Sequence, residues 1–239
     1  MDMNQTFETL SDYMAHKPIF CNQVIQLGLD ICNELIMSSK YHIVYGDIEP
    51  NRIMVIQERY RIDNREEKYD NRYAELGIKI KDSNEYMAPE VYAGGNYDER
   101  ADVYSLGLMM YVMCNEGIAP FLSADISENQ YKKRQDAQER RFAGEALQKP
   151  IHFVQGLTDI ILKACDYNPL ERYQSADECK KALEQLTLSE YEKKCCMIQP
   201  AKVITGEAHK TKYKIIISIV MVVFVLILFS IIIISILIN

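Results

Sequence analysis

The sequence lacks the cysteine and histidine patterns that mark disulfide-rich or metal-binding proteins. Its seven cysteines are odd in number and irregularly spaced, and no pair has a zinc-finger or redox spacing. The four histidines are scattered and form no metal-ligand pattern. We interpret Cys195 and Cys196 as reduced thiols, with acylation as the alternative. Three further cysteines fall on apolar helix faces and are expected to be small core residues: Cys32, Cys165 and Cys179.

Positive charge is also scarce. The chain has 27 Lys and Arg against 34 Asp and Glu, which gives a formal net charge of -7. An acidic balance of this kind argues against a nucleic-acid partner. It also argues against broad adsorption to anionic lipid.

The C-terminal segment 215–238 contains no charge, no Pro and no Gly. As a helix it would be roughly 36 Å long, enough to cross a hydrocarbon core of ~30 Å. Lys210, Lys212 and Lys214 precede it, and basic residues beside a span mark its cytoplasmic side. A core helix of this length would carry a polar stripe. The sequence therefore predicts a single-pass, C-terminal membrane anchor in the lipid bilayer, with the body of the protein in the cytosol.

The body before this segment is predicted to be mainly helical. Residues 22–39 carry a single apolar face, and residues 99–115 are apolar nearly all round, which places that helix at the centre of the body. The β-branched run 53–56 predicts a strand, followed by a charged hairpin or loop at 57–71. Other helices are expected at 6–16, 130–142, 156–166 and after a capping box formed by Ser175 and Glu178.

Three stretches carry a resemblance to a known family. The second is the most specific of them. The stretches are Tyr45-Gly46-Asp47-Ile48-Glu49-Pro50-Asn51-Arg52-Ile53; Glu85-Tyr86-Met87-Ala88-Pro89-Glu90 followed by Tyr97-Asp98-x-x-x-Asp102-Val103-Tyr104-Ser105-Leu106-Gly107; and Asn168-Pro169-Leu170-Glu171-Arg172-Tyr173. In this order they resemble the C-terminal lobe of a bacterial-type Ser/Thr protein kinase, over about residues 1–186.

This resemblance implies a mainly α fold. We expect a kinase-like C-terminal lobe, helical with a small β hairpin, over residues 1–190. A basic juxtamembrane linker is expected at 191–214, followed by one transmembrane helix at 215–238.

The resemblance also assigns the catalytic positions, and several are substituted. Asp47 stands at the position of the catalytic base. Arg52 stands where the family has a magnesium-binding Asn, and Glu75 where it has the magnesium-binding Asp. Glu49 replaces the Lys expected two residues after the base. The sequence has no Gly-x-Gly to cover phosphates, and nothing upstream supplies the strand Lys.

The structural positions of the family are retained. Glu90 and Arg172 resemble the buried pair that ties the Ala-Pro-Glu segment to the late helices. Asp102 resembles the residue that holds the catalytic-loop backbone. We further expect Arg52 to pair with Glu75 or Glu49, which would close the former metal site.

These observations favour a membrane-anchored pseudokinase that acts as an interaction module and needs no cofactor. One alternative is an active Ser/Thr kinase, using ATP and Mg²⁺, with its small lobe missing from this chain. Another is a decaying gene. The partner is expected to be a protein, or a second copy of the chain. It would bind to the exposed top of the lobe around the 22–39 helix and the Asp47 loop.

Overall fold

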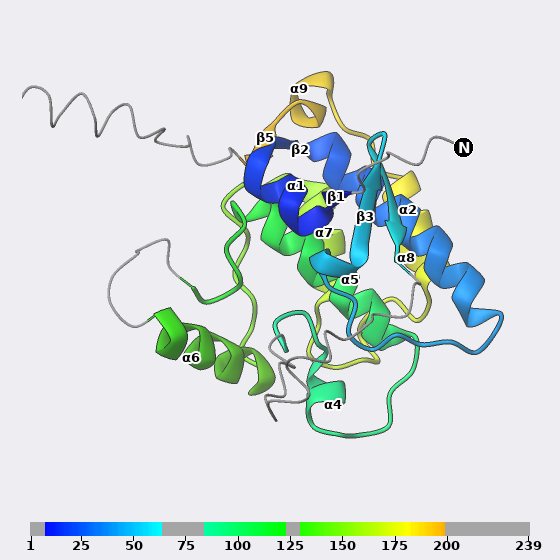
Figure 1. The fold of residues 1–239 in the computed structure, drawn as a ribbon, viewed down its shortest axis with the longest axis vertical. Helices are drawn as coiled ribbons and strands as arrows, with labels where there is room; N and C mark the ends of the chain where they lie inside the picture. Colours follow the sequence, from blue (N-terminus) through cyan, green and yellow to red (C-terminus); the bar gives the residue numbers. More distant parts are fainter. Residues whose placement is uncertain (1–7, 64–83, 123–129, 199–239) are drawn as a thin grey trace, which may run out of the picture. The chain divides into compact units, whose positions relative to one another are not determined.

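The computed structural model describes residues 8–63, 84–122 and 130–198, which all lie in one structural unit, Met1–Pro200. Helix α5 (Arg100–Cys114) forms its centre, as Figure 1 shows in green. All residues from Ala101 to Cys114 are buried. The helix is surrounded because it is apolar nearly all round, as the sequence predicts.

Helix α7 (Gln155–Ala164) packs against α5 at a glycine. A Cβ atom on Gly107 would lie 2.7 Å from the Cβ of Ala164 and 2.9 Å from the sulfur of Cys165. Contacts this short do not occur between real side chains. The missing side chain therefore sets how closely the two helices approach.

Helix α2 (Cys21–Ser39) lies between α5, α8 (Ala176–Glu184) and strand β4 (Arg59–Ile62). The Ser175 hydroxyl caps α8 by accepting a bond from the Glu178 N–H at 3.2 Å. The Glu178 carboxylate accepts from the N–H of Gln174 at 2.9 Å. In a capping box the Glu178 side chain would accept from the N–H of Ser175. Here it accepts from the N–H of Gln174, the residue before Ser175.

A three-stranded antiparallel sheet packs against α2, in the order β1 (Glu8–Thr9), β3 (Ile53–Ile56) and β4 (Arg59–Ile62). Strands β3 and β4 form a hairpin in which Ile56 pairs with Arg59, so two residues make the turn. These residues, Gln57 and Glu58, have φ of 50° and 60°, which is the mirror-image geometry favoured in two-residue hairpins. Helix α1 (Leu10–His16) and the 3₁₀ turn η1 (Pro50–Arg52) flank this sheet.

Asp30 fastens the hairpin to α2. Its carboxylate accepts bonds from the Arg59 guanidinium at 2.9 Å and from the Tyr60 N–H at 3.0 Å. Burial alone would raise the pKa of Asp30, but the bonds from Arg59, Tyr60 and Gln26 outweigh it and lower that pKa.

Two of the remaining helices lie at the periphery. Helix α4 (Pro89–Tyr92) and the charged helix α6 (Gln130–Phe142) lie below the body in the view of Figure 1. Helix α9 (Glu190–Lys193) leads to β5 (Cys196–Ile198), which pairs with β2 (Ile19–Phe20). The structure thus has a helix and a core strand at residues 190–198, where the sequence predicts the start of a linker.

The predicted fold class is wrong in its last part, because no transmembrane helix is supported. Among residues 8–63, 84–122 and 130–198, no helix is both long and apolar enough to cross a bilayer. Helix α5 is apolar nearly all round, but its 15 residues reach only about 22 Å. The segment 215–238, to which the prediction referred, lies outside the described residues. The supported fold is the helical lobe with its hairpin.

The apolar face of α2 is buried in this fold. Val24, Leu27 and Ile31 are each 0% exposed, and so is Ile48 in the loop after Asp47. The most exposed large apolar side chains in this region lie at the C-terminal end of α2 and the following turn: Met37, Tyr41 and Ile43. Phe20 before α2 and Tyr97 beside Gly46 are also exposed, at 36% and 48%. The surface that the sequence analysis expects to be bare is therefore mostly covered, and self-association through it stays a prediction.

Candidate functional site

The loop that contains Asp47 is held from below by Asp102. Its carboxylate accepts bonds from the backbone N–H of Tyr45 at 3.0 Å and of Gly46 at 2.7 Å. Asp102 is 2% exposed, and burial raises its pKa to about 6, although the two N–H bonds favour the ionised form. Two bonds to one carboxylate fix the backbone just before Asp47.

Gly46 is packed against an aromatic ring. Its φ is +75°, and a Cβ there would lie 3.0 Å from the ring of Tyr97. The left-handed backbone and the ring together exclude a larger side chain. Tyr97 thus occupies the space that a side chain at position 46 would enter.

The Asp47 carboxylate is paired with Arg52. The Arg52 Nη1 donates to the Asp47 Oδ1 at 3.1 Å. Arg52 ends the turn η1, whose geometry is set by a bond from its N–H to the Glu49 carbonyl at 2.9 Å. This short turn brings the two side chains, five residues apart, to the same side of the loop.

This pairing differs from the expectation from sequence, which considered Glu75 and Glu49 as partners of Arg52. Glu75 lies outside the described residues. The partner that the structure shows is Asp47, at the position of the catalytic base. In residues 8–63, 84–122 and 130–198, no group of three His, Cys, Asp or Glu side chains is placed to hold a metal ion.

Glu90 and Arg172 form a second ion pair away from this loop. Two guanidinium nitrogens of Arg172 donate to the two Glu90 oxygens at 2.7 and 2.8 Å. The Arg172 side chain is 0% exposed and lies over the ring of Tyr104, 4.6 Å from its centre. Its other donors reach backbone carbonyls, including that of Asp166 at 2.6 Å. The pair therefore joins α4, α5 and the loop before α8.

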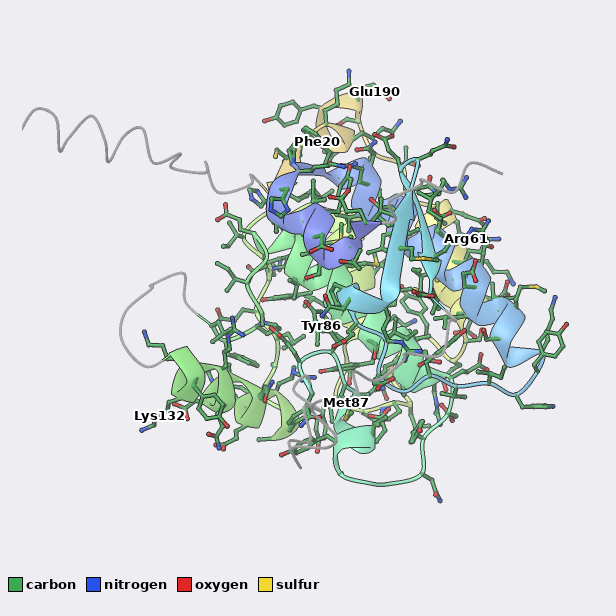
Figure 2. The ribbon with its side chains drawn as sticks, viewed as in Figure 1. Phe20, Arg61, Tyr86, Met87, Lys132 and Glu190 are labelled. Carbon is green, nitrogen blue, oxygen red and sulfur yellow. The ribbon has the colours of Figure 1, made fainter. Side chains whose placement is uncertain are left out.

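Arg141 is an anchoring residue that sequence reasoning missed. It is 5% exposed and donates to the carbonyls of Met87 at 2.6 Å and Asn84 at 2.7 Å, and to the Tyr104 hydroxyl at 3.1 Å. Figure 2 places Met87 near α4 and beside the inner end of α6. Arg141 lies in a charged helix, so no sequence signal separates it from its exposed neighbours.

Comparisons with known proteins identify the fold. Residues 3–185 match the protein kinase domain family. The chain therefore belongs to the protein kinase domain family.

The relatives are bacterial Ser/Thr kinases. The chain is 28% identical over 183 residues to a probable serine/threonine-protein kinase of Clostridium perfringens, a match that covers 75% of this chain and 26% of that protein. It is 28% identical over 175 residues to the serine/threonine-protein kinase PknB of Mycolicibacterium smegmatis, covering 70% and 26%. The chain thus spans about a quarter of the length of these curated relatives.

Proposed function

We propose that this kinase domain does not transfer phosphate and acts as a binding module, a pseudokinase. The observation that carries the proposal is the ion pair between Asp47 and Arg52. It involves the base position and a magnesium position of the family, and it joins them to each other.

The pair opposes both tasks of a kinase site. A catalytic carboxylate has to accept or orient the substrate hydroxyl, whereas Asp47 accepts from Arg52. A guanidinium has five N–H donors and no lone pair to give to a metal, and its charge is fixed. These residues therefore do not fit a divalent cation.

The contacts that support the lobe are in place. Asp102 holds the loop backbone, and Glu90 and Arg172 join α4 to the core. A scaffold with its supporting contacts and a neutralised site favours binding over chemistry. This supports the interaction-module proposal over the decaying gene.

The alternative is an active Ser/Thr kinase. It draws on the relatives, which are named as serine/threonine-protein kinases, and on Asp47 itself. It requires that Arg52 leave Asp47 when nucleotide binds.

Thermal unfolding of the whole chain with ATP and Mg²⁺ separates the two. A ligand at 100 times its dissociation constant stabilises by about 2.7 kcal/mol, so real binding is visible. We expect no Mg²⁺-dependent shift and no transfer of labelled γ-phosphate to the chain or to an added basic protein. Transfer in the wild type that disappears in Asp47→Asn would overturn the proposal and establish the kinase. A Mg²⁺-dependent shift in either protein would contradict the expectation that the site holds no divalent cation.

A further inference from the structure

Two segments that are far apart in the sequence meet at a pair of cysteines. Strands β2 and β5 pair antiparallel, with Phe20 opposite Cys196 (Figure 1). The next pair in this register is Cys21 and Cys195, and the Cys21 N–H donates to the Cys195 carbonyl at 2.9 Å. The two cysteines therefore lie opposite each other, where β2 continues into α2 and α9 leads into β5.

This placement suits a disulfide bond, although both residues are free thiols in the structure. Opposite residues of an antiparallel pair have Cα atoms and Cβ atoms about 4.5–5.5 Å apart. A disulfide needs Cα atoms about 4.4–6.8 Å apart and Cβ atoms about 3.5–4.5 Å apart. The backbone spacing is thus within range. Cys21 and Cys195 both lie just outside their strands, so a small shift that brings the Cβ atoms together breaks no ladder.

The two thiols differ in exposure. Cys21 is 0% exposed, whereas Cys195 is half-buried. Burial, and to a lesser extent the neighbouring Cys195, raises the pKa of the Cys21 thiol to about 12. A buried thiol with a raised pKa reacts slowly with a dissolved oxidant, because the thiolate is the nucleophile. Cys195 is therefore the thiol that meets an oxidant first, and Cys21 is placed to react with it afterwards.

We propose that Cys21 and Cys195 are a reversible redox pair that closes into a disulfide when the chain meets a peroxide. The Cys195 sulfur attacks a peroxide oxygen and the O–O bond breaks, which gives a sulfenic acid and, with the thiol proton, one water. The Cys21 sulfur then attacks the Cys195 sulfur and the S–O bond breaks. The hydroxyl leaves with the Cys21 proton as a second water. The two thiols lose two electrons in total, and the peroxide takes them up.

The disulfide fixes the segment 190–198 to the body of the lobe. In the reduced chain this segment is held by the short pairing of β5 with β2 and by the burial of Met197. The covalent bond adds a tie to the first residue of α2, and it closes a loop that contains most of the lobe. Disulfides that close long loops stabilise the folded state most, because they restrict the unfolded chain.

A second pair of cysteines provides an internal control. Cys32 of α2 and Cys179 of α8 are 0% and 1% exposed. A hydrogen bond between the two thiols, together with burial, raises the pKa of Cys32. These thiols are close to each other, but neither of them is exposed to a dissolved oxidant. We expect them to stay reduced at a peroxide concentration that oxidises Cys195.

Peptide mapping of the whole chain after treatment with hydrogen peroxide tests the proposal. Remaining thiols are alkylated under denaturing conditions, and the chain is then digested without reductant. We expect a cross-linked peptide that joins Cys21 to Cys195 and disappears after reduction with dithiothreitol. The midpoint of urea unfolding should move to higher urea in the oxidised chain and return after reduction.

Variants assign the two roles. Cys195→Ser should remove both the cross-link and the shift in the urea midpoint. Cys21→Ala should leave the sulfenic acid on Cys195, so that dimedone labels this residue more than in the wild type. The matched control is Cys196→Ser. Cys196 is the next residue and is also half-buried, but successive strand residues point to opposite faces, and its sulfur donates to the Ile198 carbonyl at 3.2 Å. This variant should form the cross-link as the wild type does, and circular dichroism checks that each variant is folded.

Three outcomes would overturn the inference. They are an oxidised wild type without the cross-link between Cys21 and Cys195, equal oxidation of Cys32 and Cys179, and a cross-link from Cys195 to the nearby buried Cys114 instead. None of these measurements involves nucleotide or the Asp47 loop. Failure here is therefore distinguishable from failure of the proposed lack of catalysis.

Discussion

The carboxylate of Asp102 and the backbone N–H of Gly46 form a 2.7 Å hydrogen bond between the central helix and the loop at the catalytic position. The acceptor is buried and the donor belongs to a glycine in a left-handed conformation. The position of Asp47 therefore depends on an ionisable group that lies below the loop.

Asp102 should make stability depend on pH. Burial raises its folded-state pKa to about 6, above the ~3.9 of an unfolded Asp. Between these values the folded state binds more protons, so this contribution to stability is present below about pH 4 and is lost as pH rises through about 6. A difference of about two pKa units corresponds to about 3 kcal/mol.

The measurement is urea unfolding of wild type and Asp102→Asn across this pH range. The variant loses one acceptor oxygen and should be less stable by about 1–3 kcal/mol near neutral pH. The deficit should grow as the pH is lowered, because wild-type Asp102 becomes protonated and is relieved of its burial cost. A deficit that does not change with pH would contradict the raised pKa.

The ion pair between Glu90 and Arg172 should stabilise the folded state far more than a surface ion pair does. In Glu90→Gln the Arg172 cation, 0% exposed, loses its only carboxylate within the described residues. Leaving a buried charge without its partner costs about 3–5 kcal/mol. The control is Lys181→Gln, which removes the exposed pair with Asp177 and should cost less than about 1 kcal/mol. Chemical denaturation followed by circular dichroism compares the two, and similar losses would refute the buried role.

The contact between α5 and α7 should not tolerate a methyl group at position 107. Gly107→Ala places a Cβ 2.7 Å from that of Ala164, and overpacking of this kind costs about 1–3 kcal/mol. The better helix propensity of Ala offsets up to about 1 kcal/mol of this cost. We therefore expect a net loss of about 1–2 kcal/mol in the free energy of unfolding. Gly95→Ala meets its nearest atom at 3.4 Å without a positive φ and should be neutral or slightly stabilising. A thermal melt in which Gly107→Ala matches wild type would show that the helices can separate at little cost.

The helical lobe was predictable because its signals are local. Helix α6 occupies Gln130–Phe142, the range expected from its charged periodicity, and α2 and α5 begin and end within one residue of their predicted bounds. The motif that ends in Gly107 also indicated this family. These features depend on the spacing of residues along one element.

Features that depend on distant partners were missed. The pairing of Arg52 with Asp47 follows from the turn η1, whereas charge alone allowed other acids. Arg141 is buried only because residues 84–87 fold over it. Strand β5 is three residues long and pairs with β2, which lies near the N-terminal end of the sequence, so no periodicity marks it.

The last prediction tests whether the folded lobe includes β5. Met197 is 0% exposed and belongs to the core, although it lies in a segment that resembles a linker in sequence. Met197→Ala should therefore destabilise the chain by about 2–5 kcal/mol, the cost of removing a large buried side chain. Tyr191→Ala, at 85% exposure six residues earlier, should change stability by less than about 0.5 kcal/mol. The free energy of unfolding in guanidinium measures both.

Equal, small effects would show that β5 adds no stability and that the lobe ends before it. A large loss confined to Met197→Ala would show that the lobe includes β5, because only a core position depends this strongly on side-chain volume.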